Sequence, residues 1–180
     1  MRKDAPGRAA GFSLMESMIV VAILAILAGL ALPGFQDLLR RQRTAAAMHL
    51  LSTELALARN TAISRRTPVT LCPSRGDGRC RSDPDWSEGW LLYRDPQRAT
   101  QPASPADILR DIRQPVHASI RIQSTVGRQR VRYQPGGFSG GSNLTVRVCA
   151  GAHLRGEVIV NNAGRPRTRR HEDGVPCPFP

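Results

Sequence analysis

The chain has 180 residues, which is enough for one domain of ordinary size and an appendage but short for two large domains. Its 26 Lys and Arg residues outnumber 14 Asp and Glu, for a formal net charge of +12, and Lys3 is the only lysine, which argues against a catalytic or Schiff-base lysine. Two Trp, two Tyr and four Phe are too few for a base-stacking platform of the RRM kind, so backbone electrostatics is the more direct route to any nucleic acid.

The amino-terminal region combines a short basic segment with a long apolar one. Residues 1–11 carry three basic residues and one acid, and the nineteen residues from Ser17 to Phe35 carry no charge. That length predicts a membrane-spanning helix with its basic end inside the cell. No convincing small-x-small cleavage site follows the apolar run. Glu16 lies at the start of the run, where a carboxylate is costly unless it has a partner or a function.

The segment Gly11-Phe12-Ser13-Leu14-Met15-Glu16, followed by the apolar run, resembles the class III leader junction of type IV pilins and type II secretion pseudopilins. The resemblance implies that residues 1–11 are a leader peptide, that prepilin peptidase cleaves after Gly11, and that Phe12 becomes N-methylated. It also implies that Glu16 neutralises a neighbouring subunit's amino terminus during filament assembly. Residues 12–35 would then form the transmembrane and filament-core helix. A plain signal anchor is the alternative interpretation.

The apolar pattern after residue 35 indicates that the same helix continues to about Ser64. Its apolar residues recur at intervals of three and four, which predicts one stripe that packs on a sheet. We expect residues 36–66 to be the amphipathic half of the helix. The stripe consists of Met48, Leu51, Leu55, Ala58 and Ala62.

Residues 67–180 predict a β-rich domain. Short segments rich in β-branched or aromatic residues are separated by Gly, Pro, Asn or Asp, which is typical of antiparallel strands. We therefore expect an α+β, pilin-like fold, with the long helix packed on an antiparallel β-sheet and with Trp86 and Trp90 in the core. The expected strands include residues 69–71, 90–93, 120–122, 131–133, 144–148 and 158–160.

A second set of residues narrows the resemblance. Thr70–Pro73, Cys80, Trp86–Asp95 and Ile108–Arg110 look like the FimT/FimU and GspH group of minor pilins and pseudopilins. This implies other major and minor pilins, prepilin peptidase and the inner membrane as partners. It also implies a single-pass membrane protein with a cytoplasmic amino terminus, which later enters a pilus in the periplasm and at the cell surface. The chain has no evident catalytic constellation, and we expect no enzymatic activity.

Four cysteines, all placed after the apolar run, fit an oxidising compartment. The chain has no C-x-x-C pair and its histidines are scattered, so we expect neither a metal site nor a cofactor. Four cysteines allow three pairings. Proximity and the family likeness favour Cys72 with Cys80 and Cys149 with Cys177.

Positive charge is concentrated in the carboxyl half, where residues 115–170 carry ten arginines and one acid, Glu157. Gly164 predicts a turn before alternating arginines, and side chains two apart in an extended segment point the same way, so Arg165, Arg167 and Arg169 could meet one phosphate backbone. Gly164-Arg165-x-Arg167 matches the GRxR element of FimT proteins that bind DNA during natural transformation. The resemblance implies a site for double-stranded DNA, without sequence specificity, formed by Gly164, Arg165, Arg167, Arg169 and Arg170.

Two alternatives to DNA binding remain open. Arginine bias can reflect a GC-rich genome, and a basic surface can face lipid headgroups or acidic neighbouring subunits. In that case the chain would be a structural priming subunit, FimU-like in a pilus or GspH-like in a type II secretion pseudopilus, that acts through protein contacts only.

Overall fold

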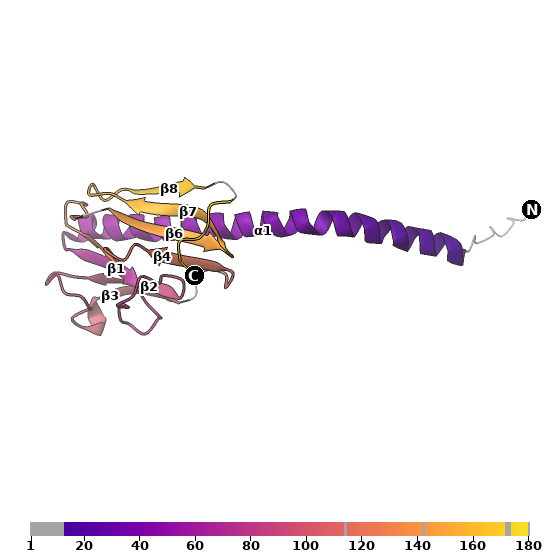
Figure 1. Cartoon of the computed structure of the whole chain (residues 1–180). Coiled ribbons are helices and arrows are strands. Elements are labelled where there is room, and N and C mark those ends of the chain that lie inside the picture. The colour runs from indigo at the N-terminus through magenta and orange to yellow at the C-terminus, as the bar shows by residue number, and fades with distance from the viewer. Residues whose placement is uncertain (1–12, 114, 142, 172–173, 180) are drawn as a thin grey trace, which may run out of the picture. The chain divides into compact units, whose positions relative to one another are not determined.

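The computed structural model describes residues 13–113, 115–141, 143–171 and 174–179, so the expected cleavage site at Gly11 and Phe12 lies outside the described residues (Figure 1). One long α-helix, α1 (Leu14–Arg65), precedes the strands. A short 3₁₀-helix, Pro105–Asp107, precedes the third strand. The strands are β1 (Val69–Pro73), β2 (Gly89–Arg94), β3 (Ile108–Arg113), β4 (Ile120–Ser124), β5 (Val131–Tyr133), β6 (Leu144–Ala150), β7 (His153–Val160) and β8 (Pro166–Arg170).

The chain divides into two compact units, residues 1–39 and 40–180. In the first, the Oγ atom of Ser13 accepts a hydrogen bond of 3.2 Å from the Glu16 N–H, which caps the start of α1. The Glu16 carboxylate lies in the first turn, where its negative charge interacts favourably with the positive end of the helix dipole. The apolar side chains that follow are exposed. By length and composition this helix can cross a membrane.

The second unit contains two four-stranded antiparallel sheets. Sheet A has the order β3-β2-β1-β5, and sheet B has the order β4-β6-β7-β8. The expected α+β fold is confirmed, but the strands divide into two sheets because β5 pairs with β1 whereas β4 pairs with β6. Strand β8, at one edge of sheet B, is formed by the arginine-rich segment.

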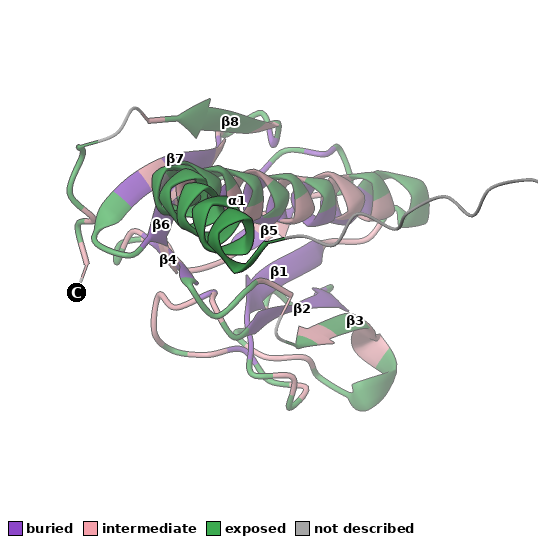
Figure 2. Cartoon of the chain, turned by 90° about the vertical axis from the view of Figure 1, so that its right-hand side faces the viewer, coloured by how far each residue is buried: buried purple, intermediate pink, exposed green. Residues whose placement is uncertain are grey.

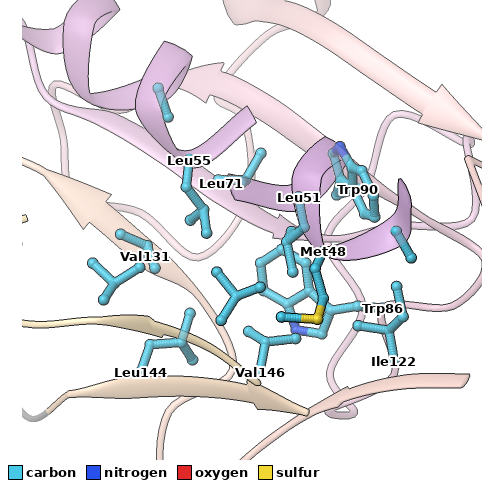
Figure 3. Close-up of a cluster of buried hydrophobic side chains, with 14 of the residues drawn as sticks. Met48, Leu51, Leu55, Leu71, Trp86, Trp90, Ile122, Val131, Leu144 and Val146 are labelled. Carbon is cyan, nitrogen blue, oxygen red and sulfur yellow. The ribbon is translucent and has the colours of Figure 1, made fainter. Parts of the chain in front are cut away.

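The core of this unit forms where the apolar stripe of α1 meets both sheets (Figure 3). All five stripe residues, Met48, Leu51, Leu55, Ala58 and Ala62, are at most 3% exposed. Leu71 and Val131 come from sheet A, and Leu144 and Val146 come from sheet B. Full burial of each large apolar side chain contributes about 1.5–3 kcal/mol.

Trp86 and Trp90 are fully buried in this core, as the sequence predicts. Their ring centroids lie 6.5 Å apart at an interplanar angle of 45°, within the range of favourable aromatic pairs. Because both tryptophans lie inside the same cluster, their fluorescence reports on the packing of the whole unit.

The structure joins the cysteines in the two pairs that the sequence favours. Cys72 and Cys80 close a loop of eight residues, and Cys149 and Cys177 close one of twenty-eight. The second disulfide holds the carboxyl-terminal tail against the β6–β7 turn, where the Leu154 N–H donates to Val175 O and the Cys177 N–H donates to Ala152 O.

Removing either disulfide should destabilise the second unit, and the longer loop should matter more. In the chain-entropy account, replacing Cys149 and Cys177 by Ser should lower the free energy of unfolding by about 3.5 kcal/mol, and replacing Cys72 and Cys80 by about 2.5 kcal/mol. Denaturant unfolding of the full chain in detergent, followed by tryptophan fluorescence, measures both. A larger loss from the shorter loop would contradict the loop-length account.

Candidate nucleic-acid interface

The arginine-rich segment begins at a tight turn between β7 and β8. The Gly164 N–H donates to Asn161 O at 2.8 Å, and the Arg165 N–H donates to the Asn161 side-chain oxygen at 3.3 Å. Asn161 therefore closes the turn with both its backbone and its side chain, as asparagine commonly does. Arg165 is exposed and directly precedes the first residue of β8.

The close packing of this turn against its neighbours requires glycine at position 164. Its φ angle is +74°, and an added Cβ atom would clash with Gly137 O and press on the Tyr133 ring. The Ser139 N–H also donates to Asn162 O at 3.0 Å. The turn is thus docked on the β5–β6 loop rather than projecting freely into solvent.

That loop is in turn held by the helix. Arg59 of α1 donates from Nε to Gly137 O at 3.0 Å, 78 residues away along the chain. The same carbonyl is the atom that leaves no room for a side chain at Gly164. The position of the arginine-rich segment therefore depends on α1 through Arg59 and Gly137.

Strand β8 separates its arginines between two faces. Arg167 lies opposite Ile159, and Arg169 lies opposite Glu157, so these two arginines share the outer face of sheet B. Arg170 is on the inner face and lines, with Thr168, a hollow beside α1. The structure therefore groups Arg167 with Arg169 but not with Arg170. Every arginine of β8 is exposed (Figure 2).

Further arginines of sheet B share the outer face. The register aligns Gln123, Arg147, Glu157 and Arg169 in one row across the four strands. Within these strands Glu157 is the single acid, and it pairs with Arg147 at 3.3 Å and lies 3.2 Å from His171. By strand register the outer-face arginines are Arg121, Arg147, Arg167 and Arg169, whereas Arg155 lies at an irregularity in β7 where the β6–β7 register skips one residue.

The carboxyl-terminal tail limits how much of the outer face of sheet B is open. Arg121 lies over the Phe179 ring, with its guanidinium carbon 5.6 Å from the ring centroid, and also donates to Gly151 O at 3.4 Å. The tail thus engages the arginine beside the β6–β7 turn. The β8 edge lies at the other side of the sheet, so the most accessible positive charge is near Arg167 and Arg169.

The sequence identifies the charge of this region but not its arrangement. Arg147 and Arg155 belong to the ten arginines counted there, but the register shift in β7 at Arg155 interrupts the two-residue alternation that a local pattern would use to place it. Each row of side chains across the sheet needs the strand register, which comes from pairings between distant segments. Over the residues that the structure describes, no group of three or more His, Cys, Asp or Glu side chains is placed to hold a metal ion.

Comparison with known proteins identifies the family. A model described as "Type II transport protein GspH" matches residues 47–164, about two thirds of the chain. The chain belongs to the GspH family. A second model, the prokaryotic N-terminal methylation motif, matches residues 7–32. Together they identify a type IV minor pilin or pseudopilin of the FimT/FimU/GspH group. The GspH match ends at Gly164, so the arginines of β8 follow the matched segment.

Solved structures share the fold. Two crystal structures of the type IV minor pilin FimU from Pseudomonas aeruginosa superpose with TM-scores of 0.52 and 0.54, each at 18% identity. The first covers 69% of this chain and 91% of FimU, and the second covers 73% and 90%. At this identity the likeness establishes the pilin fold alone.

Curated relatives match shorter stretches. A fimbrial protein of Moraxella nonliquefaciens is 40% identical over 73 residues, which are 41% of this chain and 39% of that protein. Fimbrial protein EcpC of Eikenella corrodens is 50% identical over 40 residues, which are 22% of this chain and 26% of that protein. The chain thus spans about two fifths of the length of the first fimbrial protein and about a quarter of the length of the second.

Gly164→Ala should displace the β7–β8 turn and destabilise the second unit. The positive φ angle and the clash with Gly137 O together predict a loss of about 1–3 kcal/mol in the free energy of unfolding. Gly140→Ala is the matched control, because it lies in the neighbouring loop and an added Cβ atom there meets nothing within 4 Å. Denaturant titration of both variants measures the difference, and equal stabilities would contradict the docking argument.

Proposed function

We propose that this chain is a FimT-like minor pilin that binds extracellular double-stranded DNA, without sequence specificity, for uptake in natural transformation. The observation that carries the proposal is the docked β7–β8 turn, which presents Arg165 directly before the exposed arginines of β8. Gly164, Arg165, Arg167 and Arg169 form the proposed site. Arg170 lies on the inner face of sheet B, so it would contact a DNA strand only where the DNA passes round the edge of the sheet.

The chemistry of this site suits phosphates rather than bases. Guanidinium groups donate paired hydrogen bonds to phosphate oxygens and keep their charge at any physiological pH. Arg167 and Arg169 are two residues apart on a strand, so their Cα atoms lie about 7 Å apart along one line. Few aromatic side chains are available for base stacking. Binding of this kind is independent of sequence and sensitive to salt.

A second candidate function is a structural priming subunit, FimU-like in a pilus or GspH-like in a type II secretion pseudopilus, that acts through protein contacts alone. The family match favours it, because the matched segment ends before Arg165 and Arg167. In that function the arginines of β8 would contact acidic surfaces of neighbouring pilins. DNA-binding measurements on the purified protein separate the two functions.

The amino-terminal region supports the same processing and filament assembly under both candidate functions. The methylation-motif match covers Gly11, Phe12 and Glu16. We infer that residues 1–11 are a leader removed by prepilin peptidase, that residues 12–35 hold the chain in the inner membrane with a cytoplasmic amino terminus, and that residues 36–66 continue this helix into the periplasmic domain of residues 67–180. After assembly into a pilus, Glu16 would neutralise the amino terminus of a neighbouring pilin.

Replacing Arg165 and Arg167 by Gln should weaken binding of the full chain to duplex DNA of every sequence alike. Each phosphate neutralised contributes about 0.9 to the slope of log affinity against log salt, so two lost contacts should lower the slope by nearly two. Near 0.1 M salt this corresponds to a loss of about tenfold to a hundredfold in affinity. Fluorescence anisotropy with unrelated duplexes, in an uncharged detergent, measures both quantities.

Arg40→Gln with Arg41→Gln is the matched control. It removes the same charge from exposed positions on α1 and should leave affinity and salt slope nearly unchanged. Tryptophan fluorescence of the variants confirms that the core is intact. A folded Arg165→Gln, Arg167→Gln variant with wild-type affinity would exclude this site, and a wild-type protein that does not bind DNA would leave the structural subunit as the function.

Cleavage should occur between Gly11 and Phe12. The expected product begins at Phe12 and carries one N-methyl group, because the basic leader, Gly11 and Glu16 fit the junction that prepilin peptidase processes. Mass spectrometry of the protein extracted from membranes of a strain with active prepilin peptidase checks both modifications. An intact Met1 in that strain would show the proposal to be wrong.

A further inference from the structure

A second group of arginines surrounds a hollow beside the turn between β4 and β5. The hollow has a volume of about 480 Å³. It is lined by residues 126–130, by Arg132 of β5 and by Gly140 of the β5–β6 loop, and none of these residues is acidic. Three of the seven, Arg128, Arg130 and Arg132, are arginines. These are different arginines from those of β8.

The three guanidinium groups are held in place by the protein. Arg128 donates from Nε to Arg130 O at 3.3 Å and from Nη2 to Ser139 Oγ at 3.1 Å. Arg130 donates from Nη1 to Thr100 O at 2.6 Å. Fixed guanidinium groups lose little conformational entropy when they bind a ligand.

Arg132 is fixed most firmly. It donates to the buried carboxylate of Asp95 at 2.6 Å and to Ala99 O at 2.8 Å. A guanidinium group has five N–H donors, more than these two contacts use. Arg132 can therefore hold its place in β5 and still contribute donors to a ligand in the hollow.

Burial of Arg128 makes the hollow unfavourable for positive charge. Removal of this guanidinium from water lowers the pKa of Arg128 from its ordinary value. An anion in the hollow would offset that cost, because opposite charges that are both partly removed from water stabilise each other. The ligand that matches several guanidinium groups lining one hollow is a tetrahedral oxyanion, to which arginine donates paired hydrogen bonds.

We propose that this hollow is a binding site for the phosphate group of a nucleotide. Its volume falls in the range of small-molecule sites and exceeds what an isolated phosphate ion needs, which leaves room for the attached sugar. Gly127 and Gly140 present no side chains at its wall. The phosphate could belong to a free nucleotide or to a DNA strand, since both present the same group.

The hollow and the β7–β8 turn are neighbours but separate sites. Ser139 connects them, because its Oγ atom accepts from Arg128 and its N–H donates to Asn162 O. The binding of a nucleotide phosphate here does not depend on DNA binding by Arg165 and Arg167. A strand that reaches both sites would be held at two places that the fold fixes relative to each other.

Equilibrium dialysis with labelled deoxyadenosine monophosphate tests the proposal on the full chain in an uncharged, phosphate-free detergent. We expect binding by the wild type and by the Arg165→Gln, Arg167→Gln variant. Arg128→Gln with Arg130→Gln should lose about tenfold or more in affinity, since it removes two charge-assisted contacts. Inorganic phosphate should compete for the site, whereas deoxyadenosine without a phosphate should not.

Tryptophan fluorescence checks that each variant is folded. Arg130→Gln alone is the second variant, because the Arg130 side chain lines the hollow and donates to the backbone oxygen of Thr100. Displacement of the nucleotide by duplex DNA in the Arg165→Gln, Arg167→Gln variant would assign the site to a DNA strand, and retention would assign it to a free nucleotide. No binding by the wild type, equal competition by deoxyadenosine, or unchanged affinity in the folded Arg130→Gln and double variants would each overturn the proposal.

Discussion

Packing of the α1 stripe against two sheets is the constraint on which the rest of the second unit depends. Met48, Leu51, Leu55, Ala58 and Ala62 are buried, and each sheet must turn its apolar side chains toward them. Because side chains alternate along a strand, this requirement also decides which residues face away. Arg121, Arg147, Arg167 and Arg169 of sheet B lie on its outer face for this reason, as the valines of β6 and β7 occupy the inner one, and Arg170 is the exception.

Much of this arrangement could be predicted from local sequence. The interval of three and four residues gives the helix and its stripe, and β-rich segments between turn residues give six of the eight strands. The motif at Gly11–Glu16 and the residues around Trp86 and Trp90 indicate the family before any fold is seen. These features depend on neighbours within a few residues, which a single sequence contains.

The parts that could not be predicted depend on distant contacts. Division into two sheets follows from pairings such as β1 with β5, about sixty residues apart. The alternation of Arg165, Arg167 and Arg169 suggests one common direction, but β8 begins at Pro166, and only Arg167 and Arg169 are placed together by its register. The need for glycine at 164 comes from Gly137 O and ultimately from Arg59, neither of which a local pattern indicates.

Strand β8 is also an open sheet edge, where unpaired backbone groups can recruit a strand from another molecule. Two copies that met edge to edge would bring together three arginines from each β8 and no acid from either. Like charges on paired strands are repulsive, and Pro166 removes one N–H donor from the edge. The arginines would thus oppose edge-to-edge pairing of two copies, and an anionic polymer lying along this edge would neutralise them and weaken that barrier to self-association.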